Sequence, residues 1–303
     1  MQLRIRLYHS LLLLLTVLAI SCHTLTSEQF PEFNPVPTVI SFLAEGDTLK
    51  VHVSLAEKLD VNPLGVVEDA TVDLYINDAF AETLKFVDNG IYTSTTIVRH
   101  ETKYHCKVNV PGYEQAECTE IIPSEPTIKS IEHINIAGYD IDGRNYSAVK
   151  VEFENDLDIN AYYQIIIHTK QNNGFEIPTL AEIVDPVLLN EGLPMILFSN
   201  ELIEKKQYVI TINYNNNFHI AYAGPVRMKI YPFYIELRRV SESYYRYKKQ
   251  LYLYEKNLYS DNVLTGTINQ NLYSNIDHGY GIFAGYSFSV SDVITPNLDG
   301  YYD

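Results

Sequence analysis

The chain has 303 residues and a formal net charge of −16, because 38 Asp and Glu outnumber 22 Lys and Arg. Its apolar share of 46% is ordinary for a globular protein and excludes a disordered chain. Since phosphate backbones attract Lys and Arg and repel carboxylates, the charge also excludes a nucleic-acid-binding protein. The length suits about two domains of roughly 100–200 residues each.

Residues 1–21 predict a signal peptide. Two arginines precede the apolar run Leu11–Ile20, which is about half as long as the roughly 20 residues of a bilayer span. Small residues then lead into Cys22, as in a bacterial lipobox, with Ala19 in place of the more usual Leu. We therefore predict that acyl chains such as palmitate on Cys22 anchor the mature protein to a membrane. The alternative is an ordinary secretory signal in which Cys22 stands by chance.

Residues 22–35 are short and polar, and we interpret them as the lipidated tether. From residue 36 onward, β-branched and aromatic residues alternate with polar ones between turn signals, which is typical of strands. The expected strands are Thr38–Leu43, Leu49–Leu55, Ala70–Ile76, Glu82–Phe86, Ile91–Ile97, Lys103–Val110 and Gln115–Ile121. Seven short strands predict an Ig-like β-sandwich over 36–123, and the absence of Trp from the sequence excludes an antibody-type core.

Two cysteines flank the Pro111-Gly112 turn of this sandwich. A hairpin centred on Gly112 places Cys106 directly opposite Cys118. Opposed Cβ atoms lie about 4.5–5.5 Å apart, close to what a disulfide needs, and exported chains meet oxidising conditions. We predict a Cys106–Cys118 disulfide, with two reduced core thiols as the alternative.

Residues 124–303 predict a larger β-rich domain after a linker at Ser124-Glu125-Pro126. The expected strands are Ile128–Ile136, Ala148–Phe153, Ala161–His168, Met195–Ser199, Gln207–Asn213, Val226–Arg238 and Ile282–Val290. Within Val226–Arg238, Pro232 indicates an edge position or a bulge because proline lacks an N–H. Between 170 and 194 we expect a long loop with a short helical turn.

Residues 241–259 form a predicted tyrosine-rich amphipathic helix, with Ser241 as its N-cap. Its apolar stripe recurs at three- and four-residue spacing and comprises Tyr244, Tyr247, Leu251, Tyr254 and Leu258. We expect the stripe to pack on the second sheet. The alternative is a partner-docking surface, because exposed Tyr covers area at low entropy cost. That surface would comprise Tyr244, Tyr245, Tyr247, Tyr252 and Tyr254.

After the helix come Ser274-Asn275-Ile276 and the glycine-rich segment Gly279–Ser287 (GYGIFAGYS). Earlier segments fit the same pattern, namely the lipobox, Glu68–Val72, Asn89–Tyr92, Tyr104 before Pro111–Tyr113, and Asn160–Tyr163 after Phe153. Together these motifs resemble a family of outer-membrane lipoproteins of Bacteroidetes, catalogued as domain-of-unknown-function family four-two-four-nine. The Cys106 and Cys118 pair departs from similar sequences, which usually have apolar or small residues there.

The resemblance implies a location and a class of partner. Members of the family are often encoded beside TonB-dependent receptors of the SusC type, which implies an accessory or binding role at the outer membrane. It does not select the periplasmic or the outer face. The family has no established activity, so it supplies no catalytic residues. The glycines at 279, 281 and 285 have a physical interpretation of their own, since glycine permits positive φ or close backbone approach.

Signals for metal or catalytic chemistry are weak. His100 and His105 are five residues apart, not the four of an H-E-x-x-H zinc helix. The segment Asp140–Asn145 begins like a calcium loop but lacks the closing Glu, so a turn is the main interpretation and an opportunistic Ca²⁺ site the alternative. We predict no metal, no cofactor and no catalytic residue.

The leading hypothesis is a lipid-anchored, non-enzymatic binding or accessory protein of the cell envelope that works with a TonB-dependent outer-membrane transporter. The first alternative is a structural or adhesive envelope protein. The second is a hydrolase with an unrecognised site, which a cleft holding carboxylates of raised pKa would favour.

Overall fold

The computed structural model describes residues 35–56, 65–171, 174–220, 227–258 and 272–296. The described chain is mostly β, which confirms the predicted fold class, and Pro35–Asp303 form one compact unit. The predicted signal peptide, Cys22 and the tether lie outside the described residues. Among the residues described, no helix is both long and apolar enough to cross a bilayer.

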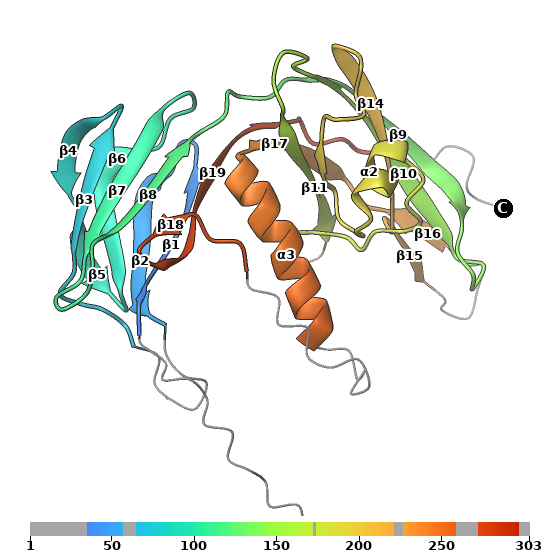
Figure 1. Ribbon diagram of the computed structural model, residues 1–303. Coiled ribbons are helices and arrows are strands. Elements are labelled where there is room, and N and C mark those ends of the chain that lie inside the picture. The colour runs from blue at the N-terminus through green and yellow to red at the C-terminus, as the bar shows by residue number, and fades with distance from the viewer. Residues whose placement is uncertain (1–34, 57–64, 172–173, 221–226, 259–271, 297–303) are drawn as a thin grey trace, which may run out of the picture. The chain divides into compact units, whose positions relative to one another are not determined.

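Two sheets pack face to face in the N-terminal part of the chain (Figure 1). The first contains β1 (Pro37–Ala44), β2 (Thr48–Leu55), β6 (Ile91–Ile97) and β5 (Lys85–Asp88). The second contains β4 (Ala79–Thr83), β3 (Thr71–Ile76), β7 (Lys103–Asn109) and β8 (Ala116–Ile121). Their alternate residues, such as Val39, Val51, Leu74 and Val108, fill a shared core. The single strand expected over Glu82–Phe86 is wrong: the chain crosses between the sheets at buried Leu84, so β4 and β5 belong to different sheets.

The rest of the chain builds a second core between the continuation of the first sheet and a separate three-stranded sheet. One face is supplied by β11 (Tyr162–Gln171) and β17 (Phe233–Val240), with the short strands β12 (Gly174–Glu176) and β13 (Leu197–Ser199). The other is supplied by β14 (Gln207–Tyr214), β10 (Asn145–Glu154) and β9 (Ile128–Tyr139). The short helix α2 (Pro186–Glu191) and the hairpin of β15 (Asn217–Ile220) and β16 (Arg227–Ile230) complete this part.

One strand expected from the sequence is divided in two. The chain pairs as β16 up to Ile230, and β17 begins only at Phe233. Pro232 lies between them, where its missing N–H interrupts the ladder and its carbonyl accepts a hydrogen bond from the Lys170 N–H at 2.7 Å. The continuous strand Val226–Arg238 is therefore wrong. β17 itself is an inner strand, paired on both sides.

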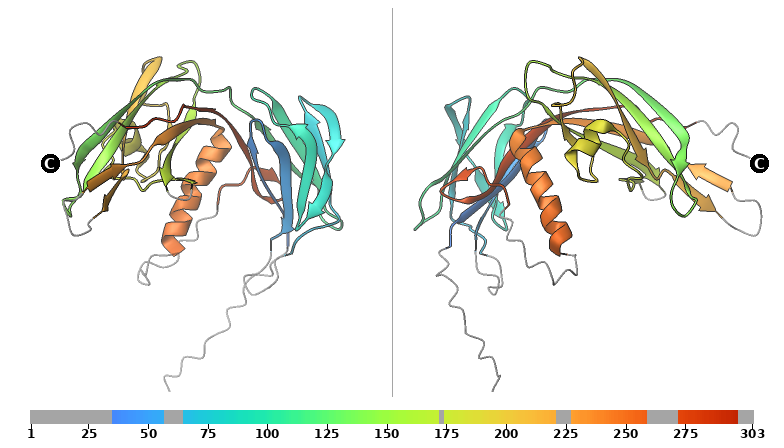
Figure 2. Two further views of the ribbon diagram at one scale, coloured as in Figure 1. Left: turned by 180° about the vertical axis from the view of Figure 1, so that it is seen from behind. Right: turned by 45° about the vertical axis from the view of Figure 1, so that its right-hand side comes forward.

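The last strand joins the two parts into one sheet. β19 (Tyr280–Val290) runs parallel to β1 along its first half and antiparallel to β17 along its second half, as the red strand in Figure 2 shows. The resulting sheet has nine strands. Just before it, β18 (Ile276–Asp277) extends the other N-terminal sheet by pairing with β8. C-terminal residues therefore complete both N-terminal sheets, and the division into 36–123 and 124–303 stays a prediction.

The glycine-rich segment allows β19 to lie close to its neighbours at this junction. Gly281 has a φ of +119°, and a Cβ there would lie 2.0 Å from the carbonyl oxygen of Val39 on β1. A Cβ on Gly285 would lie 2.2 Å from the Ile122 side chain. The asparagine of the preceding S-N-I segment fixes the same strand, because Asn275 bonds both the N–H and the carbonyl of Phe283, at 2.9 and 2.7 Å. The interpretation of these glycines as points of close backbone approach is confirmed.

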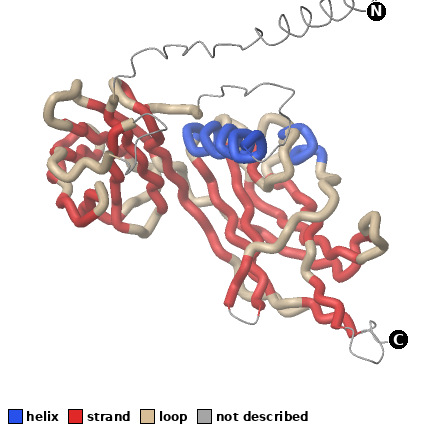
Figure 3. The backbone as a smooth tube through the Cα atoms, turned by 90° about the horizontal axis from the view of Figure 1, so that it is seen from below, coloured by secondary structure: helices blue, strands red, loops and turns tan. Residues whose placement is uncertain are grey.

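Helix α3 (Glu242–Leu258) lies over the strands of the nine-stranded sheet (Figure 3). Ser241 caps it as predicted, since its Oγ accepts from the Tyr244 N–H at 3.3 Å. The same Oγ accepts from the Gly285 N–H of β19 at 3.3 Å, so the cap also fastens the helix to the sheet. Tyr244 of the helix packs in a small apolar cluster with Leu197, Val240, Ile282 and Ala284 of the sheet.

Candidate functional site

The candidate site lies on the face of the nine-stranded sheet that carries α3. Along β17, Phe233, Ile235 and Leu237 point into the second core and are fully buried. The alternate residues Glu236 and Arg238 must therefore point to the opposite face. One face of β17 therefore builds the second core, and the opposite face presents charged and aromatic groups.

A charged cluster stands on this face. The Glu236 carboxylate contacts His168 Nε2 at 2.9 Å and Arg238 Nε at 2.6 Å, and only 13% of its side chain is exposed. The Arg238 guanidinium lies 4.3 Å from the ring centroid of Tyr286. Burial lowers the pKa of Arg238, but the hydrogen bond and charge of Glu236 outweigh it and raise that pKa. The cluster is therefore a fixed, internally neutralised set of donors and acceptors.

Five aromatic rings continue from this cluster toward α3, and we call them the aromatic row. Neighbouring ring centroids are 6.3 Å apart for Phe288 and Tyr286, 5.6 Å for Tyr286 and Tyr244, 5.7 Å for Tyr244 and Phe42, and 5.8 Å for Phe42 and Tyr247. Tyr244 is buried, Phe42 is exposed, and the other three are half-buried. Lys248 lies 5.0 Å from the Phe42 centroid. The row is a continuous apolar strip whose side chains hold one another in place.

A shallow hollow of about 470 Å³ opens at one end of the aromatic row. Its lining residues are Ala44, Asp47, Tyr234, Glu236, Tyr286, Phe288, Val290, Ser291 and Val293. The volume falls within the roughly 300–1,000 Å³ typical of small-molecule sites. Within the described chain, the exposed carboxylate of Asp47 has no side-chain partner. The hollow therefore combines aromatic walls with a free acceptor at its rim.

The structure separates the tyrosines expected to form a docking surface. Tyr244 is only 3% exposed, so the surface prediction is wrong for it: the capped first turn directs it onto the sheet. Tyr245 also faces inward, with its ring tilted against that of Tyr162 at a centroid distance of 4.6 Å. Tyr247 is half-buried and contacts Phe42 of β1 in the aromatic row. Tyr252 is half-buried and Tyr254 is exposed, and their role as a partner surface stays a prediction.

The inward side of α3 is fixed by a buried carboxylate. Glu191, at the end of α2, accepts from Tyr245 Oη at 2.5 Å and Lys249 Nζ at 2.7 Å. Burial raises the pKa of Glu191, but these hydrogen bonds and the Ser199 N–H outweigh it and lower that pKa. The sequence carried no signal that His168 would pair with Glu236 or that Glu191 would pair with Lys249, because these pairings bridge distant segments.

The two cysteines face each other as predicted. Cys106 and Cys118 are directly opposed partners of the β7–β8 hairpin, which confirms the register around Gly112. The structure contains both as free, buried thiols, with Cys118 Sγ donating to the Cys106 carbonyl at 3.8 Å. Burial and the neighbouring Cys106 raise the pKa of Cys118. The predicted disulfide is not present in this structure, and the reduced core pair is the arrangement shown.

The residues of the weak metal motifs make ordinary hydrogen bonds and ion pairs with nearby protein groups. His100 contacts Glu45, whereas His105 Nδ1 lies 2.7 Å from Thr119 Oγ1. Asp140 Oδ1 accepts from the N–H groups of Asp142 and Arg144 at 2.9 and 2.8 Å, which is a turn. In the part of the chain that is described, no group of three or more His, Cys, Asp or Glu side chains is placed to hold a metal.

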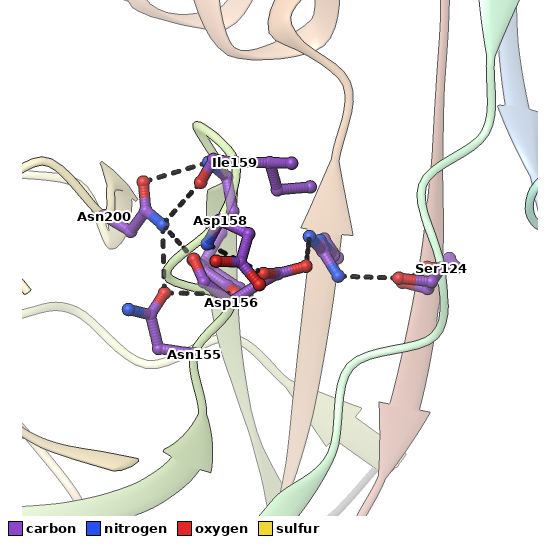
Figure 4. Close-up of polar contacts among 10 residues, drawn as sticks. Ser124, Asn155, Asp156, Asp158, Ile159 and Asn200 are labelled. Atoms are coloured by element: carbon purple, nitrogen blue, oxygen red, sulfur yellow. Dashed lines mark hydrogen bonds and ion pairs between the residues drawn. The ribbon is translucent and has the colours of Figure 1, made fainter. Parts of the chain in front are cut away.

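A polar cluster holds the linker and two loops (Figure 4). Arg239 donates to Ser124 Oγ at 2.6 Å and to Asp156 Oδ2 at 3.2 Å. The Asn200 amide donates to Asn155 Oδ1, the Asp156 carbonyl and the Ile159 carbonyl at 2.8–3.1 Å. Asp156 and Asn155 are thus structural partners that fix the chain around 124.

Beside this cluster lies a second hollow, of about 520 Å³. Glu120 lines it, and burial raises the pKa of this carboxyl despite the nearby Ser241 hydroxyl. Glu101 and Glu242 line the same hollow. This is the type of carboxylate setting that the hydrolase alternative requires.

The fold and the aromatic site describe a β-rich protein with a ligand-sized hollow on an open sheet face. A family model, described as "Domain of unknown function (DUF4249)", matches residues 26–291. The chain therefore belongs to this family, as the spaced motifs predicted. No curated protein matches the sequence.

Proposed function

We propose that this protein is a lipid-anchored, non-enzymatic binding protein of the cell envelope, and that the aromatic row and its hollow are the ligand site. The observation that supports this most directly is that the side chains of the site already contact and fix one another. Each ring of the row contacts the next, and Glu236 is held between His168 and Arg238. A site whose side chains are already ordered loses little conformational entropy when a ligand binds.

The proposed location rests on the N-terminal sequence. Acylation of Cys22 would hold the chain at the outer membrane, and the net charge of −16 gives it no electrostatic attraction to anionic lipid. We further propose that the protein works beside a TonB-dependent transporter, in line with the family resemblance. In that arrangement the site would hold a ligand near its route of entry.

Fractionation of the native envelope tests the anchor. Wild-type protein should pellet with membranes and carry acyl mass on its N-terminal cysteine, whereas Cys22→Ala should be released. Membrane pelleting of Cys22→Ala would contradict lipidation.

Detergent pull-down with mass spectrometry tests the binding role. The wild type should co-purify a defined envelope component, and Phe288→Ala, which removes one wall of the hollow, should lose it. Phe80→Ala is the matched control, because Phe80 is an exposed ring on β4, outside the site. Equal recovery with all three proteins would contradict a binding role for the aromatic row.

A hydrolase is the second candidate, favoured by Glu120. Burial raises the pKa of Glu120, and a carboxyl whose pKa is raised is a candidate general acid. If this is its role, purified protein should release products from envelope polymers, and Glu120→Gln should abolish the release while leaving the fold intact. Absence of turnover by the wild type, with ligand binding retained, would leave the non-enzymatic proposal in place.

A further inference from the structure

We propose that the outer edge of β11 binds one extended apolar residue of a partner peptide, opposite Ile167 and between β12 and β13. We call this place the β11 window. It is separate from the aromatic row and does not depend on the function proposed above. Three observations support it: the direction of the Ile167 backbone groups, two prolines that follow or precede the neighbouring strands, and an apolar hollow at the same edge.

The backbone of β11 uses its two edges in alternation. The Ile165 N–H donates to the Ile196 carbonyl at 3.0 Å, on the edge away from β17. Since every second residue of a strand bonds the same neighbour, the N–H and C=O of Ile167 point to that edge too. The opposed residue on β17 agrees, because the Ile235 carbonyl accepts from the Ser291 N–H at 2.9 Å, on the side away from β11. Ile167 therefore makes no ladder bond with β17.

The strands at this edge stop on either side of Ile167. β12 pairs with Thr169–Gln171, and β13 pairs with Tyr162–Gln164. If each register continued, β12 would place Pro178 opposite Ile167 and β13 would place Pro194 there, and neither proline has an N–H to donate. Of the groups that the structure describes, none bonds the Ile167 N–H or C=O, and the residue is 1% exposed. Such groups are rare, because each costs free energy comparable to a lost hydrogen bond.

An apolar hollow of about 210 Å³ lies at this edge. The segments that flank the gap supply its walls, namely Ile177 and Pro178 after β12, and Met195 and Ile196 before β13. The Ile167 side chain is buried in the second core, so this residue faces the hollow with its backbone. The volume is below the roughly 300–1,000 Å³ typical of sites for whole small molecules, and it suits a single side chain.

The partial charges and the lining define the ligand as an apolar peptide residue. An extended residue opposite Ile167 accepts a hydrogen bond from its N–H and donates one to its C=O, which completes an antiparallel pair. Among the described lining residues none is charged, and Gln164 Oε1 already accepts from Tyr244 Oη at 2.9 Å. A charged side chain would therefore lose its hydration in the hollow without gaining a partner. Since β12 and β13 leave only Ile167 to be paired, the peptide crosses the edge and does not extend along it.

NMR titration of the full chain, isotope-labelled on the isoleucine nitrogens, tests the window with acetyl-Ala-Leu-Ala-amide as the probe. Ile167→Val identifies the Ile167 signal by its loss. In the wild type this amide signal should move downfield as the probe binds, because its N–H gains a carbonyl partner. The same peptide methylated at the Leu nitrogen cannot donate to the Ile167 C=O, and the peptide with Asp in place of Leu brings a charge. Each should bind about tenfold more weakly than the probe.

A pair of isoleucine variants locates the binding. Ile177 is 68% exposed, so Ile177→Asp should fold, and its carboxylate beside the hollow should weaken probe binding about tenfold. Ile141→Asp is the matched control, because Ile141 is fully exposed at the turn between β9 and β10. This change should alter the affinity less than twofold.

Four results would overturn the proposal. These are an Ile167 signal that stays in place at about 20 mM probe, equal binding of the methylated peptide, equal binding of the Asp peptide, or equal effects of Ile177→Asp and Ile141→Asp. The three peptides are compared on the wild type alone, so they decide the outcome even if Ile177→Asp does not fold. Failure here leaves the aromatic row in place as a ligand site, because the pull-down with Phe288→Ala tests that site separately.

Discussion

At the scale of single residues, Glu82 shows how one carboxylate can connect two sheets. It belongs to β4, yet it accepts hydrogen bonds from Ser94, Thr95 and Thr96 of β6 in the facing sheet. Partial burial raises the pKa of Glu82, but these hydrogen bonds outweigh it and lower the pKa to about 2. The ionised form is therefore the one that the fold stabilises.

This gives a pH-dependent prediction. Because the pKa of Glu82 is lower in the folded state than its ordinary 4.5, its contribution is present above about pH 4.5 and is lost as the pH falls toward 2. Chemical denaturation across this range should show a smaller loss of unfolding free energy in Glu82→Gln than in the wild type. Glu201→Gln, an exposed change, should follow the wild type. Parallel curves for Glu82→Gln and the wild type would refute the assignment.

The cysteine pair gives a second prediction at this scale. Cys106 and Cys118 are 0% and 3% exposed, so neither should react with a thiol reagent in the folded protein, whatever their redox state. In urea without reductant, protein from an oxidising envelope should remain unlabelled if the predicted disulfide forms there. Labelling of both cysteines would instead show the reduced pair of this structure. The bridge would contribute up to roughly 3 kcal/mol to stability.

At the scale of elements, β19 depends on glycine. Gly281→Ala should destabilise the protein by about 3 kcal/mol or more, because the new Cβ meets the Val39 backbone in addition to the strain of a positive φ. Gly112 is the matched control: its φ is also positive, at +86°, but nothing lies within 4 Å of a Cβ there. Thermal denaturation should show a loss of only about 1–2 kcal/mol for Gly112→Ala. Equal losses would remove close approach as the reason for the glycine.

The docking of α3 depends on Glu191. Its side chain is 3% exposed and holds both Tyr245 and Lys249. Glu191→Gln should cost about 2 kcal/mol, because a hydrogen-bonded charge is lost from a buried position. Glu255→Gln, on the exposed side of the same helix, should be nearly neutral. Denaturant titration measures both, and a neutral Glu191→Gln would show that apolar packing alone holds the helix.

At the scale of the whole molecule, residues distant in sequence share one sheet and one core. Phe283 of β19 and Ile276 of β18 belong to the N-terminal core. In the linker, Ser124 Oγ accepts a hydrogen bond from Arg239 at 2.6 Å, and the Ser124 carbonyl accepts one from Ser287 Oγ at 2.8 Å. These contacts couple the parts that the sequence divides at 123.

We therefore expect the chain to unfold in one cooperative step. Calorimetry should give equal calorimetric and van't Hoff enthalpies. A fragment of residues 35–123 should fail to unfold cooperatively, because β1 and β8 lose their partner strands and the core loses Phe283. Two separate transitions in the full protein, or a stable fragment, would support independent domains.

Much of the fold was predictable from local signals. Period-two alternation located most strands, the opposed Cys106 and Cys118 followed from the turn at Gly112, and Ser241 marked the start of α3. The spaced motifs identified the family. Each of these depends on residues that are close in sequence, where turn chemistry and side-chain periodicity act directly.

Sequence alone therefore determined a mostly β chain, the position of helix α3 and the family. Tertiary structure decided that the glycine-rich strand joins β1 to β17, that Tyr244 is buried, and that Phe42, Tyr247, Tyr286 and Phe288 form one row. Strand order sets these outcomes, because period two says which residues share a face but not which strands become neighbours. The candidate site is made of residues up to about 250 positions apart, and the pairing of β19 with β1 on one side and with β17 on the other brings them together.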